Sequence, residues 1–188
     1  MTTSNEATKA RGAEQRAFVR VWDWFIRIFH WSLVSFFAIA WVTADELDRL
    51  HEIAGYVVAV LIGLRIIWGL VGTRHARFSD FVYRPSVVIA YLRDSVFLKA
   101  KRYLGHNPAG GAMVVALLIC LVAISATGIM LTGDSLGVED LIEELHEAIA
   151  NLTLGLVVLH VGGVILSSLE HRENLVKSMI SGLKRPDE

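Results

Sequence analysis

Four histidines have positions in the sequence that suit ligation of a metal-containing cofactor. His30 lies in the first long apolar run, and His51 opens the second. His146 and His160 both lie in the fourth run and are 14 residues apart. Since 14 residues make almost four helical turns, these two side chains share one helical face about 21 Å apart along the axis. Ionisable side chains are costly inside a membrane, so each of them needs a partner.

Depth in the membrane sorts the four histidines into two pairs. His160 lies at the predicted level of His30, and His146 lies at the level of His51. Two neutral imidazoles facing each other across a small gap are suitable axial ligands for a haem iron. Filling both axial positions favours electron transfer over oxygen binding. The spacing therefore predicts two haems b, stacked across the bilayer.

A structural role or a different metal site fits these four histidines less well. A lone histidine in a membrane is more often a hydrogen-bonded structural residue than a ligand, but here the residues pair at matched depths. A zinc or di-iron site needs ligands that converge on one point, with carboxylates or cysteines among them. The single cysteine, Cys120, lies in an apolar run and is expected to be a small hydrophobic residue.

Arg65 is a further candidate for cofactor binding. It follows His51 by 14 residues and so lies at the depth of the inner pair. A haem propionate or a quinone oxygen would account for this position, and snorkelling to the nearby membrane surface is the alternative. Small residues also occur beside the histidines, where they leave room for a planar macrocycle or allow close helix packing. These glycines are Gly55, Gly155, Gly162 and Gly163.

Three other histidines lie outside the apolar runs. His106 and Asn107 belong to a glycine-rich turn, 105–111, that leads into the third run. Their side chains are expected to contact the inner haem or a quinone headgroup, or to cap the following helix. His75 and His171 lie in basic loops and are expected to be solvated.

The apolar runs predict an all-α integral membrane protein with a four-helix bundle. Apolar residues make up 54% of the 188 residues, with a mean hydropathy of +0.50, and about 20 of them in a row suffice to cross the hydrocarbon core. Residues 21–183 are expected to form one di-haem cytochrome b domain, with a mobile polar tail at 1–20 and a short tail at 184–188. The predicted spans are Trp24–Thr43, His51–Val71, Ala109–Leu131 and Ile142–Leu169.

Charge in the connecting loops predicts the orientation. The loop 72–105 holds seven lysines and arginines against two aspartates, and the N-terminal region is also basic through Lys9, Arg11, Arg16, Arg20 and Arg27. Both termini and this loop are therefore expected in the cytoplasm. Within the loop, Pro85–Arg102 is expected to form a short interfacial helix. The other two connections, expected outside, carry Asp45, Glu46, Asp48, Asp134, Glu139, Asp140, Glu143 and Glu144.

Several short motifs occur together over Val19–Leu183. They are RIFHW at 27–31, HEIAGY at 51–56, LRIIWG at 64–69, GHNPAGG at 105–111, His146-Glu147 and Leu159-His160. In these motifs the chain resembles the bacterial cytochrome b561 and Ni,Fe-hydrogenase b-type cytochrome subunit family. The resemblance implies a four-helix bundle with two haems b, His30 pairing with His160 and His51 with His146. It also implies electron exchange between membrane quinone and a redox partner at the outer face.

The expected function is electron transfer in the bacterial inner membrane, by a subunit or a stand-alone cytochrome. Membrane lipid, quinone and a periplasmic redox protein, such as a soluble cytochrome c or a hydrogenase-like partner, are the expected partners. One alternative is a quinone-coupled oxidoreductase of the superoxide oxidase type, although acidic outer loops would repel superoxide. Another is a colourless transporter or assembly factor. Nucleic acid is not expected, because the basic residues lack interleaved aromatics.

Overall fold

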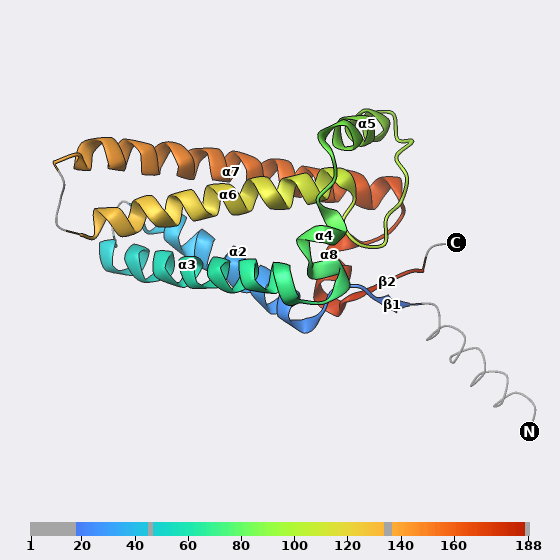
Figure 1. Cartoon of the computed structure of the whole chain (residues 1–188), viewed down its shortest axis with the longest axis horizontal. Helices are drawn as coiled ribbons and strands as arrows, with labels where there is room; N and C mark the ends of the chain where they lie inside the picture. The colour runs from blue at the N-terminus through green and yellow to red at the C-terminus, as the bar shows by residue number, and fades with distance from the viewer. Residues whose placement is uncertain (1–17, 45–46, 134–136, 187–188) are drawn as a thin grey trace, which may run out of the picture.

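Four long helices form the body of the protein. The computed structural model describes residues 18–44, 47–133 and 137–186. Within these ranges four helices are long and apolar enough to cross a membrane, which confirms the predicted all-α membrane bundle. Helix α3 packs against α6, with α2 beside α3 and α7 beside α6 (Figure 1). The four helices are α2 (Trp24–Val42), α3 (Asp48–Val71), α6 (Pro108–Leu131) and α7 (Glu139–Glu170).

Helices α3 and α7 each begin three residues before the predicted span. Helix α3 begins at Asp48 instead of His51, and α7 begins at Glu139 instead of Ile142. Both extra turns carry acidic residues, which the partial positive charge of a helix N-terminus stabilises. Hydropathy sets the length of the membrane crossing only, so it misses polar turns of this kind. At 32 residues α7 is about 48 Å long, and its ends extend beyond the hydrocarbon core.

The two ends of the described chain meet at one end of the bundle. Strand β1 (Val19–Arg20) pairs antiparallel with β2 (Leu183–Lys184). The short helices η1 (Arg74–Ala76), α4 (Phe78–Phe81), α5 (Pro85–Val96) and α8 (Leu175–Ser181) also lie here (Figure 1). We call this the terminal end, and we call the end where α2 leads to α3 and α6 to α7 the distal end.

The paired strands include the innermost residue of each predicted tail. Arg20 and Lys184 fall in the predicted tails, but they belong to the paired strands, and Lys184 is buried. Most of the N-terminal tail, with Lys9, Arg11 and Arg16, lies outside the described residues, as do 187–188 and the acidic residues Asp45, Glu46 and Asp134.

The predicted helix Pro85–Arg102 is too long. Proline opens α5 as expected, but the helix ends at Val96. Leu98 adopts a left-handed backbone conformation with φ of 55°. This turn lets the amide of Lys99 donate a hydrogen bond of 2.9 Å to the carbonyl of Asp94, which closes the helix. Leucine gives no sequence signal for such a turn, since glycine usually occupies this position.

Asp23 joins the start of α2 to the end of α3. Its Oδ1 accepts a hydrogen bond of 2.8 Å from the amide of Ile26, as an N-cap. Its Oδ2 accepts from Trp68 Nε1 at 3.1 Å and from Thr73 Oγ1 at 2.5 Å. Burial raises the pKa of Asp23, but these hydrogen bonds outweigh burial and hold the pKa below its usual value.

Glu173 performs a similar role at the junction of α7 and α8. Its buried carboxylate pairs with Arg102 at 3.0 Å and with Lys184 at 3.5 Å, and it accepts from the amide of Arg185. Burial raises the pKa of Glu173, but the bond from Arg102 and the charge of Lys184 outweigh burial, so the pKa lies below its usual value. This network ties the segment after α5 and strand β2 to the end of α7.

The Glu173→Gln variant tests this network. The folded-state pKa is depressed, so the carboxylate stabilises the fold above the ordinary glutamate pKa of about 4.3 and loses this effect as the pH falls through the folded value. We expect the variant to lose about 1–2 kcal/mol of unfolding free energy at pH 7, and the difference to shrink below about pH 4. Unfolding in mixed micelles between pH 3 and 7 measures it, with the exposed Glu143→Gln as control. An equal difference at pH 3 and pH 7 would contradict the ionic role.

Candidate functional site

His51 and His146 face each other near the distal end. His51 lies in the first turn of α3, and His146 lies two turns into α7. Their ring centroids are 6.1 Å apart, and the ring planes are inclined by 72°. Two helices that are distant in the sequence thus bring two imidazoles to one place. We call them the distal pair.

His30 and His160 form the equivalent arrangement nearer the terminal end. His30 belongs to α2 and His160 to α7, and their ring centroids are 6.5 Å apart at an inclination of 53°. We call them the terminal pair. The structure therefore brings together the two pairs expected from the spacing, while their role as ligands stays a prediction. Between the two levels, the middle of the bundle is packed by the apolar residues Val58, Ile62 and Leu121.

Hydrogen bonds indicate which tautomer the neutral rings of the distal pair adopt. Nδ1 of His51 lies 2.8 Å from the carbonyl oxygen of Ala40. A carbonyl only accepts, so Nδ1 of His51 carries the proton and Nε2 keeps its lone pair. Nδ1 of His146 lies 2.9 Å from Thr127 Oγ1, and that hydroxyl lies 3.0 Å from the carbonyl of Ala123. The hydroxyl donates to the carbonyl, so it accepts from His146 and leaves the Nε2 of this ring unprotonated as well.

The sequence alone does not predict the groups that bond to or pack against the distal pair. Thr127 and Gly128 lie on α6, and a Cβ at Gly128 would come within 3.2 Å of His146 Cε1. A side chain at this position would therefore push the ring of His146 away from α6 by a few tenths of an ångström. The sequence feature that could have indicated this contact is the adjacent pair Thr127 and Gly128 within an apolar span. The carbonyl of Ala40 gives no such indication, because every residue has one. The terminal pair is supported differently, since Nδ1 of His30 is buried without a hydrogen-bond partner in the described chain.

Arg65 is buried, not snorkelling to the surface. Its side chain is 3% exposed, and its guanidinium lies over the rings of Phe78 and Phe81, at 5.2 and 5.9 Å from their centroids. The Nη1 atom has no hydrogen-bond partner within the residues described. A buried cation with a free donor is costly, so this position suits an anionic oxygen supplied by another molecule.

His106 and Asn107 have separate environments. The ring of His106 lies between Trp22 and Phe81, with centroids 4.7 and 4.5 Å away, and its Nδ1 is shielded without a partner in the described part of the chain. Burial and then the charge of Arg65 lower the pKa of His106 to about 3, so it is neutral at physiological pH. Asn107 caps α6, because its Oδ1 accepts from the amide of Gly110 at 2.7 Å.

The two loop histidines are less solvated than expected. His75 is half-buried, and its Nδ1 lies 2.9 Å from a carboxylate oxygen of Asp80. Nε2 of His171 is buried without a partner in the residues that the structure describes. The short helices η1 and α4 cause the first difference, since they bring Asp80 back toward His75.

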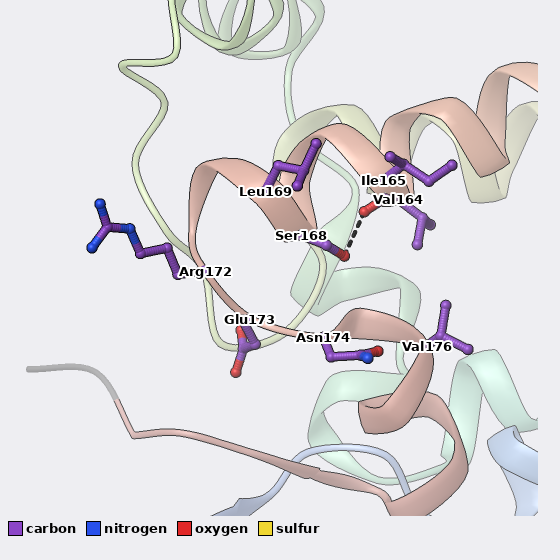
Figure 2. Close-up of a pocket in the computed structure, with 8 residues that line it drawn as sticks. All are labelled: Val164, Ile165, Ser168, Leu169, Arg172, Glu173, Asn174 and Val176. Atoms are coloured by element: carbon purple, nitrogen blue, oxygen red, sulfur yellow. Dashed lines mark hydrogen bonds between the residues drawn. The ribbon is translucent and has the colours of Figure 1, made fainter.

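A largely apolar pocket of about 380 Å³ lies where α7 meets α8 (Figure 2). It begins at Val164, one helical turn beyond His160. Val164 on α7 and Val176 on α8 lie on its two sides, and Ser168 Oγ donates to the carbonyl of Val164 at 2.6 Å. Asn174 also lines it, whereas the guanidinium of Arg172 points away from Val164 and Val176 (Figure 2). The pocket is therefore close in sequence to the terminal pair.

Comparison with known proteins defines the class of this chain. The family model for prokaryotic cytochrome b561 matches residues 21–182, so the chain belongs to that family. The chain is a membrane b-type cytochrome, a class that binds haem b and transfers electrons.

Its relatives include two hydrogenase subunits. The chain is 29% identical over 167 residues to a probable Ni/Fe-hydrogenase B-type cytochrome subunit of Azotobacter vinelandii, covering 73% of this chain and 70% of the relative. It is 28% identical over 159 residues to the probable subunit of the same description from Cupriavidus necator, covering 71% of this chain and 65% of the relative. No solved structure gives a significant match.

The histidine pairs fit haem iron. With a metal–imidazole bond of about 2.0 Å and about 1 Å more to the ring centre, two rings on opposite sides of one metal ion lie about 6 Å apart. The observed separations are 6.1 and 6.5 Å. A Cβ added at Gly55, Gly155, Gly162 or Gly163 would meet nothing within 4 Å, so these glycines do not serve close helix packing within the described chain.

Replacing Thr127 with valine tests the assignment of the distal ring protons. Thr127→Val removes the acceptor of the His146 Nδ1–H bond, so we expect the ¹⁵N chemical shifts of the His146 ring to change toward a mixture of tautomers. The matched control is Thr153→Val on α7, because Thr153 Oγ1 bonds only the carbonyl of Ile149 in the described structure. NMR of histidine-labelled protein in detergent is the measurement. Equal responses to both variants would contradict the assignment.

Proposed function

We propose that this chain carries electrons across the membrane through two haems b. His51 and His146 would ligate one haem, and His30 and His160 would ligate the other. The observation that carries this proposal is the separation of the paired rings, 6.1 and 6.5 Å, at two levels of one helix bundle. When bound, haem held by these histidines would supply one-electron redox chemistry.

The protein's own groups would hold these ligands in place. The carbonyl of Ala40 and the hydroxyl of Thr127 orient the distal rings and keep their Nε2 lone pairs available. Hydrogen bonds of this kind also raise the basicity of a ligating imidazole. Nδ1 of His30 has no such bond within the described residues, so the two pairs differ in support. This difference favours two haems with different reduction potentials.

Arg65 is proposed as the partner of a haem propionate at the terminal pair. Its unpaired Nη1 supports this role, since a carboxylate at that point would satisfy both the free donor and the buried charge. His106, neutral and also with a shielded nitrogen, lies in the same cluster of rings over Phe81. It is proposed to contact the same carboxylate or a quinone oxygen. Asn107 would contribute by capping α6, which fixes the position of His106.

Quinone is proposed as one electron carrier, bound in the pocket of Figure 2. The apolar walls formed by Ile165, Leu169 and Val176 suit an isoprenoid chain, and the amide of Asn174 offers a donor to a quinone carbonyl oxygen. The end of the pocket at Val164 lies one turn from His160, so a quinone ring bound at that end would lie nearer the terminal haem than a ring bound beside Asn174. Displacement of a bound quinone analogue by Val176→Trp, with the haem spectrum unchanged, would test this assignment.

The distal end is proposed to dock a redox protein. Exposed carboxylates of Asp48, Glu52, Glu143 and Glu147 lie there in the described chain, so a basic partner surface fits best. The hydrogenase description of the relatives makes a hydrogenase-like protein one candidate, and a soluble cytochrome c is another. With the basic loop 72–105 at the terminal end, the positive-inside rule supports cytoplasmic termini, in a bacterial inner membrane.

Single histidine variants test the pairing. We expect His51→Ala to remove one haem from the reduced-minus-oxidised spectrum and to leave the other largely intact, because the pairs are separated by an apolar layer. His160→Ala should remove the other haem. Haem quantified per chain and redox titration distinguish them. Loss of both haems from either variant, or retention of both, would show that the pairs are not two independent sites.

Arg65→Gln tests the propionate role. A buried positive charge beside a haem stabilises the reduced iron relative to the more positive oxidised iron, so its removal should lower the reduction potential of the terminal haem. We expect a fall of roughly 50–100 mV, equal to about 1–2 kcal/mol, in a spectroscopic redox titration. The control is Arg74→Gln, whose side chain is 79% exposed. A shift in the distal haem alone, or none, would contradict this role.

A further inference from the structure

Helix α5 and the turn that follows it expose large apolar side chains. Tyr91 faces the bundle, where its ring packs beside that of Tyr103. On the opposite side, Ile89 and Val96 are 67% and 75% exposed, and Phe97 and Leu98 are also well exposed. An apolar patch of this kind is unfavourable in water and typical of a surface that meets a membrane or a partner.

The position of α5 places this patch at the depth of the lipid headgroups. Helix α5 packs against α6 at the terminal end of the bundle (Figure 1). Helix α6 begins at Pro108 and has 24 residues, so it is about 36 Å long and spans little more than the hydrocarbon core. The elements beside its first turn therefore lie at the boundary between acyl chains and headgroups.

An open groove of about 760 Å³ runs along α5 and combines this apolar surface with cations. Ile89 and Phe97 form its apolar part, and Arg93, Lys99 and Asp94 form its charged part. The two cations outweigh the single carboxylate. Neither the Arg93 nor the Lys99 side chain forms an ion pair within the described residues, whereas Arg102, further along the same loop, is paired with Glu173.

The left-handed turn at Leu98 builds the charged part of the groove. With φ of 55°, Leu98 occupies a conformation that leucine adopts only at a steric cost. The turn directs the amide of Lys99 back to the carbonyl of Asp94 at 2.9 Å, and so returns Lys99 to the groove that Arg93 lines. It also leaves Phe97 and Leu98 exposed beside the two cations. The strained turn thus places the apolar side chains of Phe97 and Leu98 next to the cationic side chains of Arg93 and Lys99.

We propose that α5 and the 97–99 turn form a binding site for an anionic phospholipid. Arg93 and Lys99 hold the phosphate, and the acyl chains lie along Ile89, Phe97 and Leu98. Charge complementarity selects this occupant, because basic groups at the membrane surface attract anionic headgroups, while a zwitterionic headgroup brings a cation of its own. The site is separate from the histidine pairs, and so it does not depend on the proposed haem chemistry.

Lipid retention by the haem-loaded protein tests the proposal. The purified chain in detergent is titrated with phosphatidylglycerol or phosphatidylcholine, and bound lipid is counted by native mass spectrometry. We expect preferential retention of phosphatidylglycerol. Replacing both cations, in Arg93→Gln/Lys99→Gln, should weaken its binding about 25-fold, at about fivefold for each charge. The matched control Arg74→Gln/Arg77→Gln removes two exposed charges from the same end and should change binding by less than about twofold.

Two further variants separate binding from folding. Arg93→Lys/Lys99→Arg keeps both charges and should retain the preference for phosphatidylglycerol, with haem content unchanged. Leu98→Gly relieves the backbone strain, so it should leave the melting temperature unchanged or higher while weakening phosphatidylglycerol binding about threefold or more. Equal retention of both lipids by the unaltered protein would overturn the proposal. Equal loss in the control variant, or displacement of the lipid by inorganic phosphate at the same concentration, would also overturn it.

Discussion

The need to satisfy polar nitrogens within a membrane is the constraint on which this structure depends. An imidazole in the bilayer has two nitrogens, and each requires a partner that water does not supply. In the distal pair one nitrogen of each ring is satisfied by the protein, through the carbonyl of Ala40 and the hydroxyl of Thr127. The other nitrogen of each ring has the proposed haem iron as its partner. The same reasoning applies to Arg65, whose buried guanidinium keeps a free donor in the described structure.

The helix bundle places the two histidine pairs at two fixed levels. One helix, α7, contributes a histidine to each pair, and the 14-residue interval between them sets the distance from one site to the other. Helices α2 and α3 supply the opposing rings, and the apolar layer around Val58 and Leu121 separates the levels. The polar networks of Asp23 and Glu173 are confined to the terminal end, where they fix the starts and ends of the spans without placing further charge in the bilayer.

Much of this arrangement follows from the sequence, because hydropathy and helical period are properties of single segments. Both predict the four spans and place His146 and His160 on one face. Other features depend on contacts that no segment encodes alone. The backbone acceptor at Ala40 leaves no pattern in the sequence. Phe78 and Phe81 of α4 lie over the guanidinium of Arg65, and α5 ends early because Leu98 adopts a left-handed conformation that leucine does not predict. The pairing of β1 with β2 joins residues more than 160 positions apart, across two-residue strands too short to give a pattern.

A reduced-minus-oxidised optical spectrum of the purified protein, with haem quantified per chain, tests most directly whether the two histidine pairs hold two haems. We expect two low-spin b-type haems for each chain, since both pairs have the separation that two axial imidazoles require. One haem per chain would make one of the pairs structural, and a colourless protein would contradict the proposed electron transfer as a whole.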